Sequence, residues 1–207
     1  MRIIVLGANG RTGSQLVRLA LERDADVTAI VRSEDKRLDL EDDNLTTMLG
    51  DPCDPNFLSR AFRGKDVVVS TLGGRTPTKT ATSVYYRSAE AIVEAARDTG
   101  LKRVLVTSTA LLFPPRSLLD RLLPMIVRNT VSSARKMEQT LAGADISWTF
   151  ARCGFLTDKD VTNYRAEIDH LPGNGSPVSR KGLASFLIDS IEHPDAICQV
   201  FGVSGPE

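Results

Sequence analysis

The chain has 207 residues, of which 42% are hydrophobic and 25% charged, a composition typical of a globular protein with a sizeable core. Lysine plus arginine and aspartate plus glutamate number 26 each, so no net charge attracts nucleic acid or an anionic membrane surface. The length predicts a single domain over residues 1–207, and the charge balance favours a small molecule as the partner.

In the first half of the chain, short β-branched runs alternate with longer amphipathic stretches. The pattern predicts a first helix that packs on a sheet through Leu16, Val17, Ala20 and Leu21. A second helix is expected at 81–99, closed by a C-cap glycine at 100. The expected strands are 3–6, 27–31, 45–49 and 67–71.

The second half continues the same alternation. It predicts strands at 104–108, 146–151 and 198–203, and helices at 133–141 and 181–191. Right-handed crossovers would wind these units into an α/β fold, a doubly wound parallel sheet of the Rossmann type.

Two segments are expected to be small elements on the substrate side of the sheet, at about 111–130 and 152–180. Three prolines break any long helix in 111–130. This segment could be a substrate lid, an oligomer contact or an irregular cover of the core. The oligomeric state is expected to be a monomer or a small homo-oligomer.

The three cysteines, Cys53, Cys153 and Cys198, are far apart and have no CxxC spacing, which is typical of reduced thiols and predicts no metal site. The apolar run at 3–6 is too short for a signal peptide or a transmembrane span. A cytoplasmic protein that does not bind a membrane is therefore expected.

The strongest motif is the turn Gly7-Ala-Asn9-Gly10-Arg11-Thr12-Gly13, directly between the first strand and the first helix. The first glycine allows the tight turn, the second lets the backbone approach a pyrophosphate, and the third permits close packing of helix and strand. The helix N-terminus adds free N–H groups for the anion. We interpret these residues as binding a dinucleotide, although glycine here could serve packing alone.

The end of the second strand favours NADP(H) over NAD(H). An NAD-binding fold usually has an acidic residue at this point, whereas this chain has Arg32, followed by Lys36 and Arg37, with Arg11 in the turn. Guanidinium groups suit the 2′-phosphate of NADP because they bind it with two hydrogen bonds. Alternatively, Arg32 only begins a solvated, charged loop.

Taken together, these motifs resemble the atypical short-chain dehydrogenase/reductases, in particular the NAD(P)H-binding branch of biliverdin-IXβ reductase and flavin reductase. The resemblance covers nearly the whole chain, with Cys153 at a position where proline is usual. Its motifs are Gly7–Gly13, Val31-Arg32, Gly50-Asp51, Thr71-Leu72-Gly73, Val106-Thr107-Ser108 and Trp148–Phe155.

The resemblance implies a role for each of these motifs. Asp51 and Pro52 would lie near the adenine, and Thr71, Leu72 and Gly73 under the dinucleotide. Thr107 and Ser108 would end a strand beside the nicotinamide, and Cys153, Gly154 and Phe155 would close over it. Plainer interpretations are an ordinary turn at 51–52, a strand end at 73–74 and strand-end hydrogen bonds at Ser108.

The Tyr-x-x-x-Lys pair of most short-chain dehydrogenases is absent, because none of the three tyrosines has a lysine four residues later. A Ser-x-x-x-Lys remnant joins Ser132 and Lys136, and with Ser108 these are the candidate catalytic residues, although the helix could equally be an ordinary polar-faced one. The two histidines lack partners at the spacing that a hydrolytic or metal site needs.

Without that tyrosine, the reaction that fits best is hydride transfer from NADPH to a flat conjugated acceptor such as a flavin, quinone or tetrapyrrole, because the cofactor supplies the chemistry and water can supply the proton. The alternative is a non-catalytic NADP(H) sensor that binds a protein partner. The short C-terminal half disfavours a third candidate, an epimerase or dehydratase acting on a sugar-like substrate.

Overall fold

The computed structural model describes residues 1–74, 76–115, 125–173 and 175–206. One eight-stranded sheet organises them, in the order β3-β2-β1-β4-β5-β6-β10-β8, and every neighbouring pair is parallel except β10 with β8. The order 3-2-1-4-5-6 is that of the Rossmann fold, which confirms the predicted fold class.

The strands of this sheet are β1 (Arg2–Leu6), β2 (Asp26–Val31), β3 (Leu45–Leu49), β4 (Val67–Ser70), β5 (Arg103–Thr109), β6 (Ser147–Cys153), β8 (Arg165–Ile168) and β10 (Gln199–Ser204). The strands β1, β2 and β4 are almost continuously apolar because helices cover both faces of the sheet. The register pairs Ile3 with Val27 on one side and with Val67 on the other. The carboxyl ends of β1 and β4 therefore meet at one edge.

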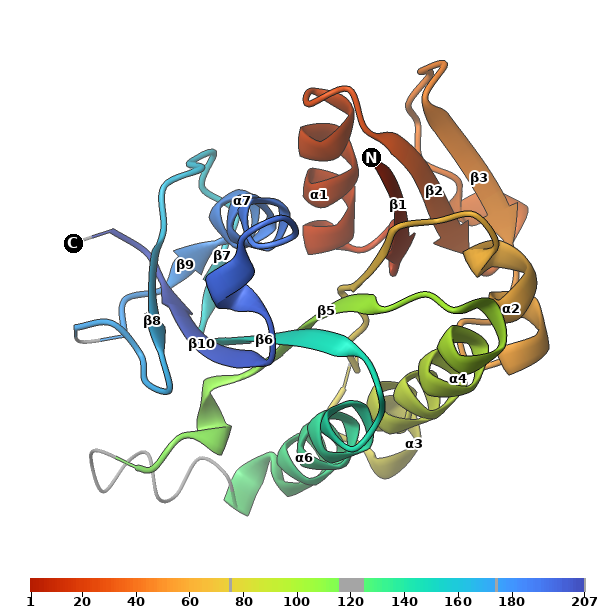
Figure 1. Cartoon of the computed structure of the whole chain (residues 1–207). Helices are drawn as coiled ribbons and strands as arrows, with labels where there is room; N and C mark the ends of the chain where they lie inside the picture. The colour runs from red at the N-terminus through yellow and green to blue at the C-terminus, as the bar shows by residue number, and fades with distance from the viewer. Residues whose placement is uncertain (75, 116–124, 174, 207) are drawn as a thin grey trace.

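Figure 1 shows the helices in two layers, with α1 and α7 on one face of the sheet and α2, α4 and α6 on the other. The helices are α1 (Arg11–Leu21), α2 (Pro55–Phe62), α3 (Lys79–Thr82), α4 (Val84–Thr99), α6 (Arg128–Ala142) and α7 (Arg180–Asp189). Each layer buries its own hydrophobic core, one around Leu16 and Leu183 and the other around Phe62 and Leu141. The short elements are η1 (Glu34–Lys36), η2 (Ala110–Leu112), η3 (Pro194–Ala196) and a separate parallel pair, β7 (Leu156–Thr157) with β9 (Val178–Ser179).

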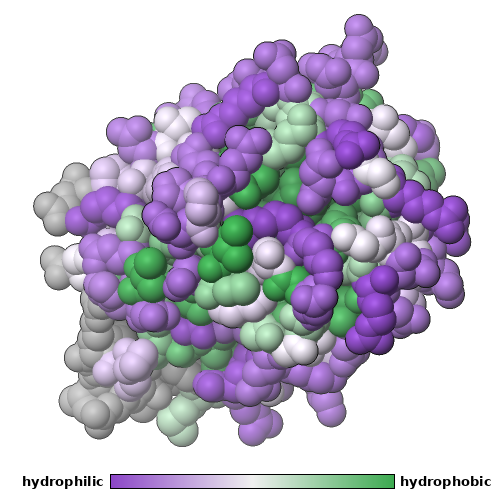
Figure 2. Space-filling model, viewed as in Figure 1, coloured by the Kyte–Doolittle hydropathy of each residue, from purple (hydrophilic) through white to green (hydrophobic). Residues whose placement is uncertain are grey.

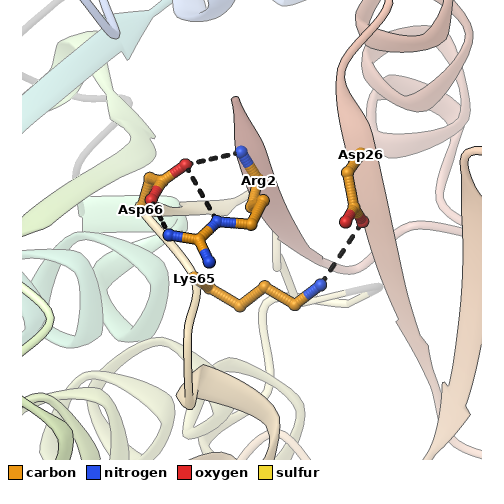
Figure 3. Close-up of polar contacts among 4 residues, drawn as sticks. All are labelled: Arg2, Asp26, Lys65 and Asp66. Carbon is orange, nitrogen blue, oxygen red and sulfur yellow. Dashed lines mark hydrogen bonds and ion pairs between the residues drawn. The ribbon is translucent and has the colours of Figure 1, made fainter.

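Two ion pairs connect the segment before β4 with the starts of β1 and β2 at the amino end of the sheet, away from the glycine turn (Figure 3). Arg2 at the start of β1 binds the carboxylate of Asp66, just before β4, with a guanidinium–carboxylate distance of 2.7 Å. Lys65 reaches Asp26 at the start of β2, at 3.3 Å. The arginine holds the pKa of Asp66 below its usual value, mainly through their side-chain hydrogen bond.

Several element boundaries differ from the sequence prediction. The expected helix at 81–99 is divided at Ser83 into α3 and α4, although its C-cap Gly100 has the left-handed conformation that was expected. Helix α6 begins at Arg128, five residues before the predicted start at 133. Helix α2 was not predicted, and neither were β7, β8 and β9, whose segments carry too little periodicity.

Candidate nucleotide-binding cleft

The glycine turn has the geometry that its sequence predicts. Gly7 has a positive φ of 80°, and its carbonyl accepts a 2.9 Å hydrogen bond from the N–H of Gly10. A Cβ on Gly13 would lie 2.1 Å from the same carbonyl oxygen, so only glycine fits there. The hydroxyl of Thr71 lies 3.2 Å from the carbonyl of Leu6 and links the end of β4 to the start of the turn.

A cleft of about 920 Å3 opens in front of this turn. Its lining comes from the turn, the ends of β2 and β4, the loop after β3, helix α3 and the starts of α4 and α7. The residues are Gly7, Asn9, Gly10, Arg11, Thr12, Ile30, Val31, Arg32, Asp51, Pro52, Cys53, Thr71, Leu72, Gly73, Gly74, Thr80, Ala81, Ser83, Val84, Arg87 and Arg180. The volume is that of a site for a large organic ligand. An open cradle of glycine backbone with arginines around it fits an anionic dinucleotide.

Most of the predicted cofactor residues thus meet in one place, although they come from four separate segments of the chain. Gly13 is buried beneath the turn. Arg37 lies apart, because it pairs with Glu34 on the exposed η1 and is not in the cleft lining. Thr107, Cys153, Gly154 and Phe155 lie at the ends of β5 and β6 and are also outside this lining.

Among the residues that the structure describes, four arginines line the cleft, and the sequence had pointed to two of them, Arg11 and Arg32. The other two, Arg87 and Arg180, stand at the start of α4 and α7, where no local motif distinguishes them from solvated residues. Within the described ranges, Arg32 and Arg87 form no ion pair with a carboxylate, whereas Arg11 and Arg180 both pair with Asp158.

The thiol of Cys53 in the same cleft is a poor nucleophile. Burial, together with the neighbouring carboxylate of Asp51, raises the pKa of Cys53 to about 11, although Arg87 and Arg32 act in the opposite direction. The thiolate that a nucleophile needs is therefore scarce at neutral pH.

A buried polar network stands at the carboxyl ends of β5 and β6. The Ser108 hydroxyl donates to Glu138 on α6 at 2.6 Å, and Arg152 donates to the same carboxylate through Nε at 3.0 Å and Nη2 at 2.5 Å. The ring of Phe113 lies 4.8 Å from the Arg152 guanidinium carbon. Ser108 and Arg152 are register partners on adjacent strands, which explains why both reach one carboxylate.

Neither Glu138 nor Arg152 was predicted from the sequence. For Glu138, however, the sequence does contain a signal. The apolar face of α6 repeats at Ala134, Met137 and Leu141, and Glu138 falls on this face at helical spacing. A carboxylate in such a position needs a partner, because burying a lone charge is costly. Arg152 carried no comparable signal.

The Ser132–Lys136 pair does not reach the cleft. Both residues are exposed, and Lys136 binds Glu90 at 2.7 Å and lies 4.0 Å from the centre of the Tyr86 ring. It is the next residue, Ser133, that points inward, where its hydroxyl lies 3.2 Å from that of Thr82.

Tyr85 packs against Gly73 of the cleft lining, and Cys153 lies beside Ser108 at the ends of β5 and β6. A Cβ on Gly73 would be 3.3 Å from the hydroxyl of Tyr85, and the Cys153 thiol donates to the carbonyl of Ser108 at 3.5 Å. Burial raises the pKa of both groups, that of Cys153 to about 12. Both are therefore neutral at physiological pH.

The exposed large hydrophobic side chains among the described residues include Met125, Ile126 and Phe155, the last at 74%. Part of the predicted element at 111–130, residues 116–124, lies outside the described residues.

In the part of the chain that the structure describes, no helix is long and apolar enough to cross a bilayer. The same residues contain no group of three or more His, Cys, Asp or Glu side chains that could hold a metal ion.

A family model described as NAD(P)H-binding matches residues 7–194. The NAD(P)H azoreductase of Xenophilus azovorans is 26% identical over 212 residues, which cover 99% of this chain and 68% of the relative. The photosystem II assembly factor Ycf39 of Synechocystis is 30% identical over 109 residues, 52% of this chain but only 33% of that protein.

Among solved structures, a wide-type short-chain dehydrogenase/reductase from Veillonella parvula, in complex with NADP, has a TM-score of 0.81 and 21% identity. The match covers 99% of this chain and 94% of that one. This likeness confirms the Rossmann-type fold.

Proposed function

Because this chain belongs to the NAD(P)H-binding family, we propose that it is an NADPH-dependent reductase that transfers hydride to a flat conjugated acceptor, such as a flavin, a quinone or a tetrapyrrole-like compound. The observation that carries the proposal is the cleft in front of the Gly7–Gly13 turn, which has the size, the backbone cradle and the positive charge that a dinucleotide phosphate needs. A bound reduced nicotinamide would supply the hydride.

The preference for NADPH rests on Arg32. Its side chain lines the cleft at the end of β2 and has no carboxylate partner among the described residues, so its guanidinium can bind a 2′-phosphate without first breaking an ion pair. Arg37 has less to contribute, because it is paired with Glu34 outside the cleft.

The residues beside the inner end of the cleft favour an acceptor that needs no acid from the protein. The Ser108 proton is directed at Glu138, and burial keeps the pKa of Tyr85 above its usual value. Neither is a ready proton donor, so we assign the proton to water. The exposed ring of Phe155 offers a surface on which a flat acceptor can stack.

The relative named NAD(P)H azoreductase supports reduction of a small conjugated molecule, and an azo compound therefore belongs among the candidate acceptors. We further propose that residues 1–207 form one domain, with the segments near 111–130 and 152–180 on the acceptor side.

The test is NADPH consumption by purified protein with FMN, riboflavin, a quinone, an azo compound and biliverdin, alongside measured NADPH and NADH binding. Turnover well above the uncatalysed rate with any acceptor supports the reductase and identifies its acceptor class. If neither cofactor binds, the proposal is wrong.

The alternative is a sensor that binds NADP(H) without turnover and changes its affinity for a protein partner. The observation in its favour is that Ser132 and Lys136, the remnant of the usual catalytic pair, face away from the cleft and Lys136 is engaged with Glu90. Tight cofactor binding with no turnover across the whole panel would favour this function over the reductase.

A further inference from the structure

One carboxylate at the rim of the cleft is shared by two arginines that lie far apart in the sequence. Asp158 pairs through Oδ1 with Arg180 at 2.7 Å and through Oδ2 with Arg11. Arg11 belongs to the glycine turn, and Arg180 is the first residue of α7. The carboxylate thus bridges the two helices that cover one face of the sheet.

Arg11 and Arg180 each line two neighbouring cavities. Both line the large cleft, and both line a smaller polar pocket together with Asp158. The Arg180 side chain is only 16% exposed, whereas the side chains of Asp158 and Arg11 are 58% and 66% exposed. The carboxylate can therefore move into solvent, while Arg180 stays beside the cleft.

The segment that carries Asp158 lies across the start of α7. Lys181 binds Asp160 at 2.6 Å, and the Ser179 hydroxyl donates to the carbonyl of Val161. A Cβ on Gly182 would lie 2.9 Å from the carbonyl oxygen of Asn163. These contacts hold residues 160–163 against the helix independently of Asp158. The face of the molecule in Figure 2 carries hydrophilic residues over much of its area, with hydrophobic residues exposed among them near its centre.

We propose that Arg180 joins Arg11 in binding the pyrophosphate of the dinucleotide, and that Asp158 occupies both arginines until the cofactor displaces it. The inference rests on the proposed cofactor site and adds to it a binding residue and a competing carboxylate. A pyrophosphate carries two negative charges and accepts several charge-assisted hydrogen bonds, so it replaces one carboxylate favourably. The carboxylate then turns outward into water.

A substitution at a binding site usually weakens binding, but a substitution of Asp158 is expected to strengthen it. Removing the negative charge of Asp158 removes a competitor, so the cofactor should bind more tightly. The pyrophosphate is common to NADPH and NADH, so both cofactors should gain by the same factor. This separates Asp158 and Arg180 from Arg32, whose effect is expected on NADPH alone.

The experiment measures dissociation constants of NADPH and NADH by cofactor fluorescence for the wild type, Asp158→Asn, Asp160→Asn and Arg180→Ala. Asp158→Asn should tighten both cofactors by about two- to fivefold, the range that an exposed ion pair spans. Arg180→Ala should weaken both by about tenfold. Asp160→Asn is the matched control, because Asp160 lies on the same segment but pairs with Lys181, which is not in the large cleft.

Unchanged or weaker binding by Asp158→Asn would overturn the proposal, and so would an equal gain in Asp160→Asn, which would show an effect of net charge alone. A misfolded variant cannot produce the tighter binding, so the result does not depend on the stability of Arg180→Ala. If the wild type binds neither cofactor, the proposed function itself has failed. Binding by the wild type without a gain in Asp158→Asn contradicts only this inference.

Discussion

The Ser108 hydroxyl donates a 2.6 Å hydrogen bond to the carboxylate of Glu138, and both side chains are less than 10% exposed. Ser108 lies near the carboxyl end of β5. Glu138 lies on the buried face of α6, thirty residues further along the chain. Arg152 on β6 completes the group. Strands β5 and β6 and helix α6 are thus joined through one carboxylate.

Removing that carboxylate should destabilise the protein. Glu138→Ala leaves the Arg152 guanidinium mostly buried without its partner, and we expect a loss of about 2–4 kcal/mol in the free energy of unfolding, measured by denaturant titration. The control is Glu90→Ala, which removes an exposed ion pair with Lys136 and should cost less than about 1 kcal/mol. Equal losses in the two variants would contradict the importance of burial.

Gly13→Ala should destroy the cofactor turn. The new Cβ would meet the Gly7 carbonyl oxygen at 2.1 Å, and a backbone atom cannot move aside as a side chain can. NADPH binding should weaken by more than about tenfold, and unfolding free energy should fall by about 1–3 kcal/mol. Gly143→Ala adds a Cβ 3.3 Å from the Gln139 carbonyl oxygen, far from the cleft, and should leave NADPH binding as it is. Wild-type affinity in Gly13→Ala would show that the turn does not bind the cofactor.

Arg32→Ala tests the choice of cofactor. It should weaken NADPH binding by roughly 1–3 kcal/mol and NADH binding far less, because only NADPH carries the 2′-phosphate. The matched variant Arg37→Ala removes an arginine that pairs with Glu34 outside the cleft, and both affinities should stay near those of the wild type. An equal loss of NADPH and NADH affinity in Arg32→Ala would remove the 2′-phosphate assignment.

Asp66→Asn should lower stability in a pH-dependent way. Arg2 lowers the pKa of Asp66 in the folded protein, so its contribution is present above the pKa of the unfolded state and is lost as pH falls through the folded pKa. The unfolding free energies of wild type and Asp66→Asn should therefore differ slightly at neutral pH and converge in acid. The loss stays small because the pair is exposed at the sheet edge. A difference that grows as the pH falls would contradict this account.

Local sequence was sufficient for the fold class and for the first part of the cleft. The turn from Gly7 to Gly13 could be identified because its requirements are local: a positive φ, a close backbone approach and a helix that begins at once. The alternation of β-branched runs and amphipathic stretches likewise predicted the parallel sheet, since the two periods reflect which faces are buried. Weakly periodic elements such as α2 and β8 escaped detection for the same reason.

Only the tertiary structure decided which charged residues face the cleft. Arg32 and Arg37 both follow the second strand, and the sequence does not distinguish between them. In the structure, Arg32 lines the cleft, whereas Arg37 pairs with Glu34. Arg180 and Asp158 meet Arg11 because α7 packs beside α1, a contact that no local pattern encodes. Periodicity determines which face of an element is buried, whereas the partner of a charged side chain depends on long-range packing, which places residues more than a hundred positions apart within hydrogen-bonding distance.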